Sequence, residues 1–152
     1  MKKIALSILF LCFISAKETD IELQLETTQY LLDVTSYEYL SKSLNIFYSV
    51  FELANIDDKD EFDVAAYMFT SEMESLEWLV AEYKNEIPVA YPGVDLSENW
   101  LLGLYNDMYM AHSFAYAFIE STIPGNEYDE SLAEKAYIYA DKVASQLYPE
   151  EE

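Results

Sequence analysis

The chain has 152 residues, of which 29 are acidic and eight are lysines, and its formal net charge at neutral pH is −21. A field of this sign attracts cations and basic proteins and repels nucleic acid, so the composition argues strongly against nucleic-acid binding. Disorder is rejected because it accompanies high charge only where hydrophobicity is low, whereas this chain is 52% hydrophobic and has 14 tyrosines.

Residues 1–16 have the three parts of a cleavable export signal. Lys2 and Lys3 form a basic start, the run from Ile4 to Ile14 is apolar, and Ala16 ends a small-residue exit. We therefore predict cleavage after residue 16 and export to the periplasm or the medium. A membrane-spanning helix needs about 20 apolar residues, so we do not expect a stable anchor in the mature protein.

Cleavage would remove Cys12, which is the only cysteine, so no disulfide would support the mature fold. Lipidation of Cys12 is not expected, because Leu11 precedes it instead of a small residue. The loss of two lysines lowers the formal charge from −21 to −23. The length suits a single domain over residues 17–149, followed by an acidic tail at residues 150–152.

Apolar residues from position 21 to about 54 recur at helical spacing, which predicts either one helix or two nearly continuous helices with a kink or break near Thr35 and Ser36. Residues 55–61 combine turn formers with carboxylates, and Asp58 or Asp60 is the predicted cap of the next helix. A calcium-binding loop starting at Asp58 fails, because it has no glycine at its sixth position and no carboxylate at its twelfth. The second helix follows from Phe62 and is predicted to end at Ile87 and Pro88, with Glu72 on its polar face.

The third predicted helix covers residues 96–122 and is apolar around nearly its whole circumference, which indicates a central position. Asp95 and Glu98 have the spacing of a capping box. Trp100 is expected on one of its inward faces, and Gly103 is expected where a neighbouring helix comes close. Residues 123–126 end this helix.

A fourth helix is predicted to start after Asn126 or Asp129 and to end near residue 147. Its alanines at positions 136, 140 and 144 are four residues apart, which permits close packing of another helix. No segment has the alternating pattern of a strand. The sequence therefore predicts an all-α fold, a bundle of four or five helices.

His112 is the only histidine, and Met108 precedes it by one helical turn. Thioether and imidazole ligands together select copper(I), so Met108 and His112 are weak candidates for a metal site. Core packing explains both residues better, and we predict no cofactor.

No motif for catalysis is present: there is no Gly-x-Ser-x-Gly motif, and three glycines are too few for a phosphate-binding loop. Glu74 and Glu77 could form an acid and base pair on one helix face, although acidic residues this abundant form such pairs by chance. We predict that the protein is not an enzyme and has no catalytic residues, while a carboxylate-dependent enzyme stays open as an alternative.

Several tyrosines fall outside the predicted inward faces, and tyrosine is enriched at binding surfaces. Candidates for partner binding are Tyr37, Tyr83, Tyr91 and Tyr128. We expect a small exported acidic binding protein whose partner is a basic protein, for example an inhibitor or immunity protein acting on a cell-wall hydrolase. The alternative is a helical carrier of a small apolar ligand or metal, with a cavity beside Trp100, Met108 and His112.

Overall fold

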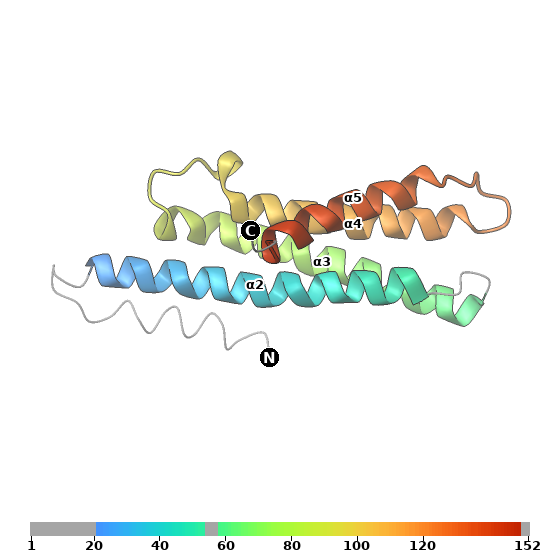
Figure 1. Cartoon of the computed structure of the whole chain (residues 1–152), viewed down its shortest axis with the longest axis horizontal. Helices are drawn as coiled ribbons and strands as arrows, with labels where there is room; N and C mark the ends of the chain where they lie inside the picture. Colours follow the sequence, from blue (N-terminus) through green and yellow to red (C-terminus); the bar gives the residue numbers. More distant parts are fainter. Residues whose placement is uncertain (1–20, 54–57, 150–152) are drawn as a thin grey trace.

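The computed structural model describes residues 21–53 and 58–149, which form four α-helices, one short 3₁₀-helix and no strand (Figure 1). The α-helices are α2 (Ile21–Leu53), α3 (Lys59–Ala90), α4 (Trp100–Ser121) and α5 (Ser131–Leu147), and the 3₁₀-helix η2 (Leu96–Glu98) precedes α4. The predicted all-α bundle is confirmed. The predicted signal at residues 1–16 and the acidic tail at 150–152 lie outside the described residues.

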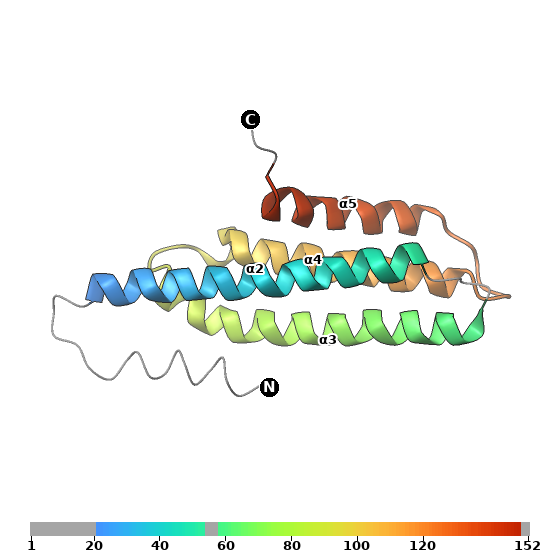
Figure 2. The same ribbon diagram turned by 60° about the horizontal axis from the view of Figure 1, so that its bottom comes forward.

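Helix α4 lies at the centre of the bundle and packs against α2, α3 and α5. Figure 2 shows α3 and α5 on opposite sides of the molecule, with α4 between them. The buried residues of α4 cover more than one face of the helix and include Leu104, Tyr105, Met108, Ala111, His112, Ala115 and Ile119. The central position predicted from its all-round apolar surface is confirmed. None of the helices within the described ranges has the length and hydropathy of a membrane-spanning segment.

Helix α2 is continuous, so of the two predicted alternatives the structure has the single helix, without a break near Thr35 and Ser36. The Thr35 hydroxyl donates to the carbonyl of Leu31 at 2.8 Å, and this bond within the helix occupies the side chain that could otherwise favour a turn. Ser36 lies on the same buried face as Leu32 and Leu40, so packing holds the helix straight through this polar pair.

Helix α3 is capped as expected but ends later than expected. The Asp58 carboxylate accepts from the backbone amides of Asp60 and Glu61 at 2.9 and 3.2 Å. The predicted end at Ile87 and Pro88 is wrong, since the helix continues to Ala90. Proline here removes only one hydrogen bond of the last turn, and the burial of Ile87 and Ala90 keeps that turn helical.

Two consecutive caps shift the start of α4 from the expected residue 96 to Trp100. Asp95 caps only η2, where its carboxylate accepts from the amide of Ser97 at 2.8 Å. The buried Asn99 then caps α4 by accepting from Leu101 and Leu102 at 3.1 and 3.2 Å. A helix that begins here leaves Trp100 in its first turn, 49% exposed, which corrects the expected inward position.

The expected close approach of a neighbouring helix at Gly103 is wrong, because no described atom outside the adjoining residues and the nearby backbone of α4 would lie within 4 Å of a β-carbon there. The alanine ridge of α5 behaves as predicted. Ala136 and Ala140 are fully buried, and α4 is the helix with which α5 makes its most extensive contact. Small side chains let the two backbones approach closely.

Candidate functional site

An open groove of about 650 Å³ lies where α2 passes the first turn of α4 and the last turn of α5. Helix α2 contributes residues at positions 30, 33, 34, 37 and 38. Each of these positions lies three or four residues from at least one other of the set, which is the spacing of a single helical face. The groove is lined by Tyr30, Asp33, Val34, Tyr37, Glu38, Leu40, Trp100, Leu101, Leu104, Gln146, Leu147 and Pro149.

Three aromatic side chains of the groove are unusually exposed. Trp100 is 49% exposed, Tyr37 is 44% exposed and Tyr30 is 67% exposed. Tyr148 of the α5 end packs edge-on against Tyr37, with ring centroids 6.0 Å apart. A contiguous exposed patch of large apolar side chains is a feature of binding surfaces.

The N-terminal half of α2 is anchored beside this groove by two polar contacts to the end of α3. The Gln29 amide donates to the carbonyl of Ala90 at 2.5 Å. The Tyr91 hydroxyl donates to the carboxylate of Asp33. Burial raises the pKa of Tyr91, and the hydrogen bond to Asp33 raises it further, so the tyrosine remains a donor at neutral pH. Asp33 is therefore held in a fixed position at the groove.

The groove is negatively charged. Its described lining contains the carboxylates of Asp33 and Glu38 and no lysine. Within residues 21–53 and 58–149, ion pairs join only Lys59 to Asp63 at 2.7 Å and Lys142 to Asp107 at 3.9 Å. The two groove carboxylates thus have no cationic partner in the described structure, and they add to the strongly negative field of the chain.

A second polar constellation is buried where α2, α3 and α4 meet. The Ser43 hydroxyl donates to Oε2 of Glu72 at 2.8 Å, and the same carboxylate oxygen accepts from the Tyr39 hydroxyl at 3.2 Å. Ser43 Oγ also lies 2.9 Å from Nε2 of His112. Because the only hydroxyl proton of Ser43 is used toward Glu72, Nε2 of His112 must donate to Ser43.

The neutral form of the His112 ring therefore carries its proton on Nε2 and a lone pair on Nδ1. Nδ1 is buried and has no hydrogen-bond partner in the described structure. The ring is fully buried between Phe47 and Phe69. This burial lowers the pKa of His112 to about 4.

Serine, histidine and a carboxylate meet in this network, yet their arrangement does not suit nucleophilic catalysis. In a catalytic triad, histidine accepts the serine proton and the carboxylate binds the other ring nitrogen. Here Ser43 donates its hydrogen bond to Glu72, and Nδ1 of His112 has no partner in the described structure. Ser43 is also only 1% exposed, so a substrate has no access to it. The network therefore links three helices of the core.

The four tyrosines predicted to bind a partner are not brought together. Tyr37 lies in the groove, and Tyr91 supports it through Asp33. Tyr83 packs against the buried ring of Tyr105, with centroids 5.3 Å apart. Tyr128 is exposed, but it lies in the loop between α4 and α5, at the opposite end of the bundle (Figure 1).

The two candidate metal ligands, Met108 and His112, are fully buried on α4. The histidine already uses Nε2 toward Ser43. Within the described ranges, no cluster of three or more histidine, cysteine or acidic side chains could hold a metal ion. Trp100 lies two to three helical turns away, at the surface. Trp100, Met108 and His112 therefore do not line the shared cavity that was expected for a carrier.

The candidate acid pair does not share a site. Glu74 and Glu77 are both exposed on α3. Glu74 lines a pocket together with Tyr39 and Trp78, whereas Glu77 lines a different pocket together with Tyr109. Their placement offers no shared cleft for an acid and a base.

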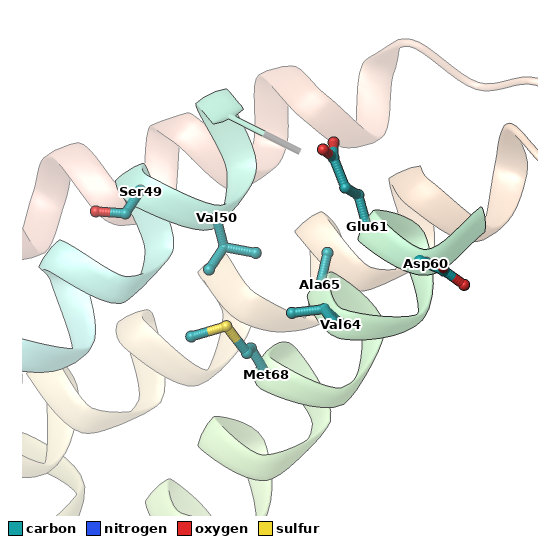
Figure 3. A pocket seen from close by; sticks show the side chains of 7 residues that line it. All are labelled: Ser49, Val50, Asp60, Glu61, Val64, Ala65 and Met68. Atoms are coloured by element: carbon teal, nitrogen blue, oxygen red, sulfur yellow. The ribbon is translucent and has the colours of Figure 1, made fainter. Parts of the chain in front are cut away.

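A smaller pocket of about 360 Å³ lies between the end of α2 and the start of α3 (Figure 3). Val50, Val64 and Met68 supply apolar atoms, and Asp60 and Glu61 extend from the first turn of α3. Carboxylates in a first turn stabilise the helix end, so these two acids are explained by the helix itself. The adjoining residues 54–57 lie outside the described residues.

Sequence reasoning missed two features of these sites. Glu72 was expected on the polar face of α3, but it follows Phe69 by three residues and precedes Leu76 by four, which is the spacing of the buried face. The groove depends on the exposed stripe of α2, whose sequence signal is a second set of periodic positions at 30, 34 and 37.

No known protein family matches the chain, and no match is found among curated proteins or solved structures.

Proposed function

We propose that this chain is a small exported binding protein that engages a basic protein partner through the groove between α2, α4 and α5. An inhibitor or immunity protein that acts on a basic cell-wall hydrolase is the example we favour. The observation that carries the proposal is the groove itself, which combines exposed aromatic rings with two carboxylates that have no cationic partner among the described residues.

Charge supports the choice of partner. A protein with a net charge of −21 attracts a basic partner over long range and orients it before contact. Aromatic side chains then supply the apolar contact area on which affinity depends. Because the electrostatic part is screened at high ionic strength, binding should weaken as salt is added.

The proposal can be tested by capturing a partner from the periplasm or the medium at low and high salt, with the wild type and two variants. Trp100→Ala removes the exposed ring of the groove. Trp78→Ala is the matched control, because Trp78 is 50% exposed but lies on α3. We expect a partner that Trp100→Ala loses, that Trp78→Ala retains, and that is released by salt. A partner held equally by both variants, or none at all, would refute the proposal.

A helical carrier is the second candidate, because a groove of about 650 Å³ has the size of a small-molecule site. It predicts a ligand that copurifies with the wild type. The ligand should be lost from the variant Leu104→Trp, because Leu104 is a buried residue of the groove lining and a larger side chain there would fill the groove. Native mass spectrometry distinguishes the two functions: a bound small molecule of constant mass favours the carrier, and a clean protein mass counts against it.

A further inference from the structure

We infer that the groove binds the side-chain ammonium group of a lysine on the partner, together with the apolar stem that carries it. The inference rests on the proposed function, since it names the group of the basic partner that enters the groove. It follows from three properties of the lining: its rings, its carboxylates and its apolar walls.

The rings of Tyr30, Tyr37 and Trp100 provide faces suited to a cation. An ammonium group over a tryptophan or tyrosine ring is attracted by the negative face of the ring. The chain already uses this contact elsewhere: Lys142 Nζ lies 4.4 Å from the centre of the Tyr139 ring, and Lys135 Nζ lies 5.6 Å from that of Phe114. In the groove the rings are present, and none of the described residues that line it is a lysine.

The carboxylates of Asp33 and Glu38 select a cation over other occupants. Tyr91 holds one oxygen of Asp33, which leaves the second oxygen available to accept a hydrogen bond. A neutral apolar occupant would strip water from both carboxylates without replacing it, which is costly. An anion, or a second copy of a chain with a net charge of −21, would be repelled.

The apolar walls suit the stem of lysine. Leu101, Leu104 and Leu147 lie along the groove, and Pro149 lines it at the end of α5. A lysine side chain carries four methylene groups below its charge, and such stems bury readily along apolar surface while the ammonium keeps polar contacts. The groove thus offers a separate environment to each part of one side chain.

The experiment uses the full mature chain with Trp78→Phe, which leaves Trp100 as the only tryptophan and a fluorescence reporter of the groove. The probes are end-capped tripeptides with lysine, norleucine or arginine between two alanines. Norleucine keeps the apolar stem and lacks the ammonium group. We expect saturable binding of the lysine peptide and at least about tenfold weaker binding of the norleucine peptide, the ratio that corresponds to one charge contact of this kind.

A double variant tests the carboxylates. Asp33→Asn with Glu38→Gln removes both charges while keeping an oxygen to accept from Tyr91, and we expect affinity for the lysine peptide to fall about tenfold or more. The control, Glu74→Gln with Glu77→Gln, makes the same change in net charge on α3 and should alter affinity less than twofold. Circular dichroism verifies that both double variants are folded.

The outcomes separate this inference from the proposed function. Equal binding of the norleucine and lysine peptides, tighter binding of the arginine peptide, or no effect of the Asp33 and Glu38 double variant would overturn the inference. If no lysine peptide binds but the partner is still lost with Trp100→Ala, the inference falls and the proposed function stands. If the lysine peptide binds in the groove but no partner depends on Trp100, the proposed function falls.

Discussion

Lowering the pH should remove the stability that the neutral ring of one side chain, His112, contributes to this protein. The ring is fully buried, and burial lowers its pKa to about 4, against 6.5 for an accessible histidine. At a pH between these two values, His112 is protonated in the unfolded chain and neutral in the folded chain. The stability contributed by the neutral ring is therefore complete above pH 6.5 and is lost as the pH falls toward 4.

The size of the effect follows from the same two pKa values. The interval between 6.5 and about 4 corresponds to about 3 kcal/mol of unfolding free energy. That is a large part of the usual stability of a small domain, about 5 to 15 kcal/mol. Carboxylates titrate over part of this range too, and protonating them relieves the repulsion of a strongly acidic chain. The contribution of His112 must therefore be measured as the difference in unfolding free energy between the wild type and a variant that lacks this histidine.

We would measure urea unfolding of the wild type and of His112→Gln from pH 7.5 to 4.5. Glutamine keeps an amide that can donate to Ser43 but does not titrate, so subtracting the two stabilities cancels the carboxylate background. We expect the advantage of the wild type to shrink by about 1.4 kcal/mol for each pH unit below 6.5. The side-chain NMR signals of the only histidine, in a chain without a histidine tag, give its pKa directly.

The reasoning would be refuted by a histidine titration midpoint at or above 6.5, or by a stability difference that grows as the pH falls. Either result would mean that the negative charge of Glu72, acting through Ser43, outweighs the burial of the ring. A variant too unstable to study would leave the NMR midpoint of the wild type as the deciding measurement.

Three further predictions concern stability measured by thermal or urea unfolding at pH 7. Gly103→Ala should stabilise the protein by about 0.5 to 1 kcal/mol, because the glycine is exposed within α4 and a β-carbon there meets nothing; no change or a loss would contradict this. Asn99→Ala should cost about 1 kcal/mol by removing the cap of α4, whereas Asn99→Asp should cost much less. Phe47→Ala should cost about 3 to 5 kcal/mol, since its buried ring packs against His112, Phe51 and Tyr137, and a loss below about 1 kcal/mol would show that the site collapses.

The sequence predicted the helices well because apolar periodicity and caps are local signals. Asp58 was foreseen as a cap, and the all-round apolar character of α4 predicted its central position. The helix ends were missed where two local signals compete. Asp95 and Asn99 are both good caps four residues apart, and burial of Asn99 decides which of them begins α4. Likewise, packing of Ile87 and Ala90 carries α3 past Pro88.

The candidate site was only partly predictable because it is assembled from three helices. Tyr37 was recognised as a candidate from its position outside the inward stripe, but nothing local indicates that Trp100 and Leu147 lie beside it. The link between Glu72 and His112 is equally non-local, since Ser43 of a third helix joins them. A single sequence shows which residues share a helix face, and the pairing of faces depends on the whole fold.

The groove is a consequence of unequal helix lengths. Helix α2 has 33 residues and α5 has 17, so at about 1.5 Å per residue α5 covers about half the length of α2. Helix α5 ends at Leu147, and within residues 21–53 and 58–149 no further helix covers the first turn of α4 and the N-terminal half of α2 on that side. Among these residues Trp100, Tyr30 and Tyr37 are exposed there, and such a patch of large apolar side chains is typical of a binding surface. We expect the two carboxylates to disfavour pairing of that area with a second copy of the same acidic chain and to favour the cationic partner that we propose.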